Sequence, residues 1–215
     1  MKLSLYYYFT IASFLVSLLL FKQPRTPLYL KLFTVLLGTT LLVDGYGHYL
    51  ANHGRANHRI YSIFTSSELA FYLYVLSRII QNPKMRFAIM PLLIFYAFVA
   101  IIDISIVQKN GFASFTYSLG SMVVIYYSIY YFFELFRNPK SIKLKNEPSF
   151  WICLGLLIYY CGTIPWYLLM VFLIKAPRNI LNNLYIGIEV LNILLYTFFI
   201  IAFVCRVKKP NYTSQ

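Results

Sequence analysis

Residues 87–107 read FAIMPLLIFYAFVAIIDISIV, a continuous apolar run interrupted by one carboxylate, Asp103. A helix rises about 1.5 Å per residue, so a run of this length spans the roughly 30 Å hydrocarbon core of a bilayer. Six further apolar runs of similar length occur near residues 4–21, 28–50, 60–80, 116–136, 150–174 and 183–207. The sequence therefore predicts an all-α, polytopic integral membrane protein, a seven-transmembrane-helix bundle forming one domain over residues 1–215.

The composition agrees with a bilayer environment. Hydrophobic residues make up 60% of the chain and charged residues 12%, whereas an ordinary soluble domain is about 45–50% apolar. The formal net charge of +13 is compatible with nucleic-acid binding, but on so apolar a chain the cations are more naturally those of a cytoplasmic face. We expect the lipid bilayer as a partner and no nucleic acid.

Lysine and arginine are divided unevenly between the two ends of the predicted helices. One end collects thirteen of the nineteen: Lys22, Arg25, Lys31, Arg78, Lys84, Arg86, Arg137, Lys140, Lys143, Lys145, Arg206, Lys208 and Lys209. Cytoplasmic loops carry the excess of these residues, which predicts an N-terminus outside and a C-terminus in the cytoplasm. The short outer loops and the absence of a cleavage site after the first apolar run favour a multi-pass protein of a prokaryotic inner membrane.

Acidic residues fall within the predicted helices at Asp44, Glu68, Asp103 and Glu189. An ionisable group inside a membrane span costs several kcal/mol and is a functional candidate for that reason. If successive helices alternate in direction, all four carboxylates lie in the outer third of the bilayer. We expect them to form a cluster there.

Polar and aromatic side chains continue this pattern at helical spacing. They recur as Asn182, Tyr185, Glu189, Asn192 and Tyr196 in the last helix, Tyr61, Thr65, Glu68 and Tyr72 in the third, Thr40, Asp44 and His48 in the second, and Tyr160, Thr163 and Tyr167 in the sixth. These stripes predict a polar, aromatic-lined cavity open to the outside. The alternative is that they form interhelical hydrogen bonds that hold the bundle together.

No lysine or arginine is expected inside the membrane at this depth, which favours a small or cationic ligand. The ligand-binding residues we expect are Glu68, Glu189, Asn192, Tyr185, Tyr72, Asp103 and Trp166. The carboxylates would supply negative charge, the amide and hydroxyl groups hydrogen bonds, and the indole a cation–π contact. The resulting hypothesis is a sensor- or receptor-like protein that acts through a cytoplasmic or membrane partner, docked on the basic segment Arg137–Lys145, which also suits anionic lipids.

Two other functions are compatible with the same residues. Asp44 and His48 lie one helical turn apart and, with an oxygen from Glu68, Asp103 or Glu189, could hold zinc or another cation. The protein would then be an intramembrane zinc-dependent hydrolase of a lipid-like substrate. A small transporter or a structural subunit of a membrane complex is the third hypothesis, so the sequence leaves open whether the chain is an enzyme.

Comparison with seven-helix families excludes several of them. Retinal proteins carry a lysine in the middle of the last helix, and residues 185–204 contain none. Rhodopsin-like receptors carry a DRY motif after the third helix, where this chain has Leu76-Ser77-Arg78-Ile79. His48 resembles the first zinc ligand of the alkaline ceramidase and adiponectin-receptor class, but the last predicted helix lacks the histidine pair of that class.

Overall fold

The computed structural model describes residues 4–23, 26–107, 112–137, 144–173 and 178–208, without the side chains of 144, 166–173 and 178–184. All regular structure in these ranges is helical: α1 (Leu5–Leu18), η1 (Leu19–Lys22), α2 (Leu28–Asn52), α3 (His58–Ile79), α4 (Pro83–Ile102), η2 (Asp103–Val107), α5 (Ser114–Arg137), η3 (Leu144–Asn146), α6 (Pro148–Leu173) and α7 (Arg178–Lys208). The all-α prediction is confirmed.

The long helices agree with the apolar runs except at their polar ends. α4 begins at Pro83, four residues before the expected start, because Asn82 caps it by accepting a hydrogen bond from the Lys84 backbone N–H over 3.0 Å. Proline is also well suited to a first helical position. The apolar pattern misses such starts because the first turn of a helix can lie among polar headgroups.

Six of these helices are long and apolar enough to cross a membrane. They begin at Leu5, Leu28, Pro83, Ser114, Pro148 and Tyr185, the last being the described part of α7. The remaining long helix, α3, carries Ser62, Thr65, Ser66, Ser67 and Glu68 in its first half, which lowers its hydropathy. The multi-pass, membrane-embedded character of the chain is therefore supported by its structure.

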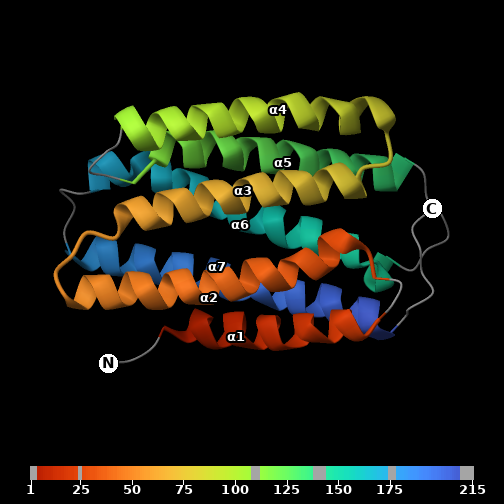
Figure 1. Cartoon of the computed structure of the whole chain (residues 1–215), viewed down its shortest axis with the longest axis horizontal. Helices are drawn as coiled ribbons and strands as arrows, with labels where there is room; N and C mark the ends of the chain where they lie inside the picture. Colours follow the sequence, from red (N-terminus) through yellow and green to blue (C-terminus); the bar gives the residue numbers. More distant parts are fainter. Residues whose placement is uncertain (1–3, 24–25, 108–111, 138–143, 174–177, 209–215) are drawn as a thin grey trace.

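The helices run side by side in alternating directions (Figure 1). Contacts between successive neighbours close a ring in the order α1, α2, α3, α5, α6, α7 and back to α1, while α4 packs outside the ring against α3 and α5. α1 begins at one end of the bundle and α7 ends at the other (Figure 1). We call these the N-terminal end and the C-terminal end of the bundle.

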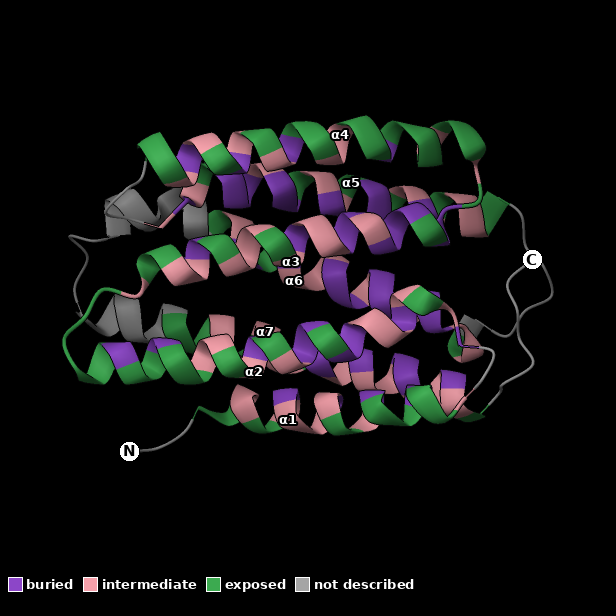
Figure 2. Cartoon of the chain, in the orientation of Figure 1, coloured by how far each residue is buried: buried purple, intermediate pink, exposed green. Residues whose placement is uncertain are grey.

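The outer helix α4 shows how the bundle treats apolar side chains. Large hydrophobic residues lie on its outward surface, including Phe87 at 79% exposure and Ile94 at 71%. In Figure 2 the exposed colour dominates α4, whereas buried residues are concentrated in the second half of α3 and in the first two thirds of α5. A surface this apolar would be unstable in water and suits a lipid environment.

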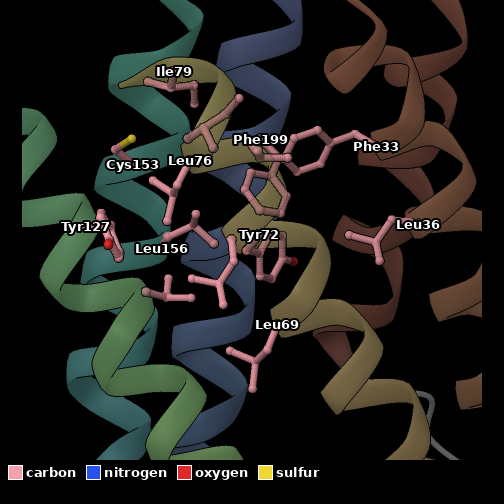
Figure 3. Packing of buried hydrophobic residues seen from close by; sticks show 14 of the residues in the cluster. Phe33, Leu36, Leu69, Tyr72, Leu76, Ile79, Tyr127, Cys153, Leu156 and Phe199 are labelled. Atoms are coloured by element: carbon pink, nitrogen blue, oxygen red, sulfur yellow. The ribbon is translucent and has the colours of Figure 1, made fainter. Parts of the chain in front are cut away.

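The ring is filled by a layered core at its middle and C-terminal end. Phe33 of α2 and Phe199 of α7 meet edge-to-face with ring centroids 5.1 Å apart, and Tyr72 of α3 lies 6.2 Å from each of them. Figure 3 shows these rings converging with Leu69 and Leu76 of α3. Phe33, Tyr72 and Phe199 are buried, so this aromatic layer closes the interior of the ring.

Candidate ligand-binding site

A cavity of about 470 Å³ opens between the ring helices at the N-terminal end of the bundle. Its walls are Tyr6, Thr40, Asp44, His58, Tyr61, Phe64, Thr65, Glu68, Phe112, Tyr159, Tyr185, Ile188, Asn192, Leu195 and Tyr196. They come from α1, α2, α3, α6, α7 and the residues before α5. The size is within the range of small-molecule sites, roughly 300–1,000 Å³. His58 and Tyr185 are exposed, so the cavity has a mouth at this end.

Two carboxylates enter the cavity, Asp44 from α2 and Glu68 from α3. Glu68 lies ten residues after the start of α3, or about 15 Å along the helix. It is therefore near the middle of the length of α3. The Tyr72 hydroxyl donates a 2.8 Å hydrogen bond to Glu68, and the Tyr6 hydroxyl lies 3.5 Å from an Asp44 oxygen.

Tyrosine and phenylalanine rings provide seven of the fifteen lining residues that the structure describes. Tyr61 approaches α2 so closely that a Cβ atom at Gly47 would lie 2.5 Å from its hydroxyl oxygen. Glycine at position 47 is therefore a requirement for the position of this ring. The faces of such rings attract cations through their quadrupole, and they surround the two carboxylates.

No lysine or arginine belongs to the lining that the structure describes, and His58 at the mouth is its one basic side chain. The polar neutral groups are Thr40, Thr65 and Asn192. Asn192 donates its amide N–H to the Ile188 carbonyl over 2.9 Å, which leaves the amide oxygen as an acceptor. The cavity thus offers acceptor oxygens, negative charge and aromatic faces, the chemistry that suits a positively charged molecule.

The floor of the cavity is the aromatic layer of the core. Tyr72, which binds Glu68, is 1% exposed, and its ring lies 6.1 Å from Tyr160 of α6. On α5, Tyr117 shares a 2.9 Å hydrogen bond with Thr163 of α6. The buried rings of Tyr72 and Tyr160 close the described interior one turn beyond Glu68, so the cavity ends near the middle of the bundle.

Glu189 occupies a different place from the one we expected. It accepts a 2.6 Å hydrogen bond from the backbone N–H of Leu5, the first residue of α1, and does not line the cavity. Ser4 at the N-cap of α1 makes no side-chain capping bond. Glu189 of α7 supplies that cap from across the helix interface, and a carboxylate at a helix N-terminus is electrostatically favourable.

Asp103 also acts at a helix start. One of its carboxylate oxygens accepts bonds from the Thr116 backbone N–H at 3.1 Å and from the Thr116 hydroxyl at 2.6 Å. Asp103 is 4% exposed. It lies in the π-helical turn η2 after α4 and joins that turn to the first turn of α5, apart from the cavity.

Glu134 repeats the arrangement at the C-terminal end of the bundle. Its two oxygens accept hydrogen bonds from the backbone N–H groups of Gln81 at 2.9 Å and Asn82 at 2.7 Å, just before α4. Three of the six acidic residues of the chain therefore satisfy backbone donors at the start of another helix. Asp44 and Glu68 line the cavity. The sixth, Glu147, precedes α6 and interacts electrostatically with Arg206.

The expected metal ligands are only partly brought together. Asp44 and Glu68 share the cavity, whereas His48 is exposed and is not part of its lining. Within the described ranges no group of three or more His, Cys, Asp and Glu side chains is placed to hold a metal ion. The geometry therefore gives no support to the triad of Asp44, His48 and Glu68.

The remaining expected site residues divide into three groups. Tyr185 and Asn192 line the cavity, and Tyr72 lies directly beneath it. The Trp166 side chain lies outside the described residues. Arg137 ends α5 and Lys145 belongs to η3, while the residues between 137 and 144 lie outside the described ranges.

Seven lining residues lie outside the polar stripes predicted from the sequence: Tyr6, His58, Phe64, Phe112, Tyr159, Ile188 and Leu195. Tyr6 stands on an apolar helix with no polar stripe, and Phe112 precedes a helix, so helical spacing could not find either. Tyr159 replaces its neighbour Tyr160, which is buried in the floor. Of the predicted sixth-helix stripe, Tyr160 and Thr163 are buried, and the side chain of Tyr167 lies outside the described residues.

No protein family model, characterised protein or solved structure matches this chain. Its function has to be inferred from the site itself.

Proposed function

We propose that the chain is a seven-span membrane protein that binds a small organic cation in the cavity at the N-terminal end and acts through a partner protein. The observation that carries this proposal is the pairing of Asp44 and Glu68 in an aromatic-lined cavity whose described lining holds no lysine or arginine. A cation there gains Coulomb energy that is far larger than in bulk water. It also gains cation–π attraction from the tyrosine rings.

The seventh span in this proposal is α3. Its polar residues do not argue against a crossing, because α3 is flanked by α2, α4 and α5 and faces the cavity rather than lipid alone. Polar groups of this kind in membrane helices normally face the bundle interior. With seven crossings the two termini lie on opposite sides. The excess of lysine and arginine then assigns the C-terminal end to the cytoplasm and the cavity to the outside of a plasma membrane.

A partner is proposed because the described connections between helices are short, as in His53–Asn57 and Ile80–Asn82. The cytoplasmic candidates for docking are the cations around α5 and η3, Arg137 and Lys145.

The binding proposal is tested by thermal unfolding of the purified full chain in detergent. The probes are quaternary ammonium ions of increasing size, starting with choline, and the neutral isostere of choline, 3,3-dimethylbutan-1-ol. A bound ligand raises the unfolding temperature in proportion to its saturation. We expect stabilisation by the cations and none by the neutral isostere. The Asp44→Asn/Glu68→Gln double variant should lose about tenfold or more in cation affinity.

Glu189→Gln is the matched control, because it neutralises a carboxylate at the same end of the bundle outside the cavity. Equal stabilisation by choline and its neutral isostere would reject the cation proposal. Uptake of the cation into proteoliposomes would instead identify a transporter. Transport would require the aromatic layer below the cavity to move apart. Stoichiometric zinc bound through Asp44 and Glu68 would favour the hydrolase.

The seven-span topology has its own test. Single cysteines at Ala56 and Gln81, at opposite ends of α3, are introduced after replacement of Cys153, Cys161 and Cys205. If α3 crosses the membrane, a membrane-impermeant maleimide added to intact cells labels position 56 and spares position 81. Labelling of both positions from one side would show that α3 does not cross.

A further inference from the structure

A second hollow lies on the outside of the ring, in the seam between α3 and α4. It has a volume of about 370 Å³, and its lining is Arg59, Ile63, Ser66, Ser67, Ala70, Tyr96, Ala97, Ala100, Ile101, Ile104 and Ser105. It shares no residue with the cavity. Ile63 is 50% exposed and Ile101 65% exposed, so this groove faces the surroundings of the bundle, which in a membrane means lipid.

The groove has the length of one bilayer leaflet. From Arg59 to Ala70 the wall formed by α3 extends eleven residues, or about 16 Å. From Ser105 back to Tyr96 the wall formed by η2 and α4 extends nine residues, or about 14 Å. Half of a hydrocarbon core is about 15 Å thick. The groove therefore runs from the membrane surface to the middle of the bilayer.

The groove is charged at its surface end and apolar deeper down, in the same order as the headgroup and the acyl chains of a phospholipid. Arg59 stands at the surface end in the first turn of α3, and it is the one formally charged side chain in the described lining. Small side chains such as Ala97 and Ala100 leave room deeper down, between Ile63 and Ile101. A guanidinium is well matched to a phosphate, and the apolar part is matched to an acyl chain.

Tyr96 forms the deep end of the groove. The tyrosine is 1% exposed, belongs to the groove wall and lies beside Ser66 of α3, which belongs to the same wall. The groove is therefore closed toward the interior of the bundle at the depth where an acyl chain would end.

We propose that the groove between α3 and α4 is a binding site for one anionic phospholipid of the leaflet at the N-terminal end, with its phosphate on Arg59 and an acyl chain between Ile63 and Ile101. The site prefers the opposite charge to that of the cavity, whose lining contains two carboxylates. The two sites lie on opposite faces of α3. They can therefore be tested separately.

The test is native mass spectrometry of the full chain, purified in detergent and given equal amounts of phosphatidylglycerol and phosphatidylcholine with identical acyl chains. We expect one phosphatidylglycerol to be retained in preference to phosphatidylcholine. Arg59→Gln should reduce that preference about fivefold. Arg78→Gln is the matched control, because it removes an exposed arginine from the other end of the same helix and should leave the preference unchanged.

Ser67→Phe provides a second variant, which fills the groove from an exposed position. It should reduce retention of both lipids. Equal retention of the two lipids by the wild type, or an unchanged preference in Arg59→Gln, would overturn the proposal, as would full retention in Ser67→Phe. The choline-induced rise in unfolding temperature, measured on the same samples, is unaffected by loss of the lipid site, so failure of either proposal is recognised separately.

Discussion

The Tyr72 hydroxyl donates a 2.8 Å hydrogen bond to the Glu68 carboxylate one helical turn earlier on α3. The bond joins the floor of the cavity to its deepest acidic group. Tyr72→Phe keeps the ring in the aromatic layer and removes the donor. We expect a loss of about 1–3 kcal/mol in unfolding free energy, measured by reversible denaturation in mixed micelles. Tyr126→Phe, at a tyrosine that is 55% exposed, should change stability by less than about 0.5 kcal/mol.

The capping contact between Glu189 and Leu5 predicts a loss of stability without a loss of ligand binding. Glu189→Ala should destabilise the protein by about 0.5–2 kcal/mol, because it removes the oxygen that accepts the Leu5 N–H. Hydrogen exchange should accelerate in the first turn of α1. The affinity for a quaternary ammonium ion should change by less than about twofold, since Glu189 does not line the cavity. A tenfold loss of cation affinity in this variant would show that Glu189 takes part in cation binding.

Asp103 and Thr116 offer a double-mutant cycle across the end of α4 and the start of α5. The variants Asp103→Asn and Thr116→Val each remove part of one buried arrangement with bonds of 2.6 and 3.1 Å. Each should cost about 1–3 kcal/mol, because a hydrogen bond to a buried charged group is lost. The double variant should cost less than the sum of the two. Additive losses would show that the two side chains do not interact.

The close packing around Gly120 of α5 predicts that a larger residue there destabilises the protein. A Cβ atom at this position would lie 2.7 Å from the Tyr96 ring and 2.9 Å from a Leu69 methyl group. Both neighbours are 1% exposed and have little room to move. Gly120→Ala should therefore destabilise the protein by about 1–3 kcal/mol through overpacking, despite the higher helix propensity of alanine. At Gly187, where an added Cβ meets nothing within 4 Å, the same substitution should stabilise the helix.

Glu147, next to the start of α6, predicts a dependence of stability on pH. Burial raises the pKa of its carboxyl above the ordinary value of 4.5, while a hydrogen bond from Ser149 and the charge of Arg206 oppose the rise. Below about pH 4.5 the group is protonated in both the folded and unfolded states and contributes nothing. As pH rises from there through the folded pKa, ionisation favours the unfolded chain and stability falls to a plateau.

The measurement is the difference in unfolding free energy between the wild type and Glu147→Gln from pH 4 to pH 8. That difference should fall as pH rises and then level off. A difference that grows with pH would mean that the charge of Arg206 outweighs the burial of Glu147.

The helical class was predictable because a bilayer imposes a strong and simple rule: each crossing needs about 20 apolar residues with all backbone groups bonded internally. Helix ends were less predictable. α4 begins at Pro83 and α7 at Arg178, because charged first turns carry no apolar pattern. The polarity of α3 was visible in the sequence, but its place between α2, α4 and α5 was not.

The sequence by itself determined that acidic and aromatic residues gather at one end of an apolar bundle, because depth follows from counting residues along each helix. Only the tertiary structure decided which of them face one another, because that depends on rotation about each helix axis and on the neighbour met there. Glu189 and Asn192 are about 60° apart around α7, and this rotation turns one toward the start of α1 and the other into the cavity. Because η2 packs beside the start of α5, Asp103 bonds to Thr116. Asp44 and Glu68 lie on neighbouring helices, α2 and α3, and line one cavity.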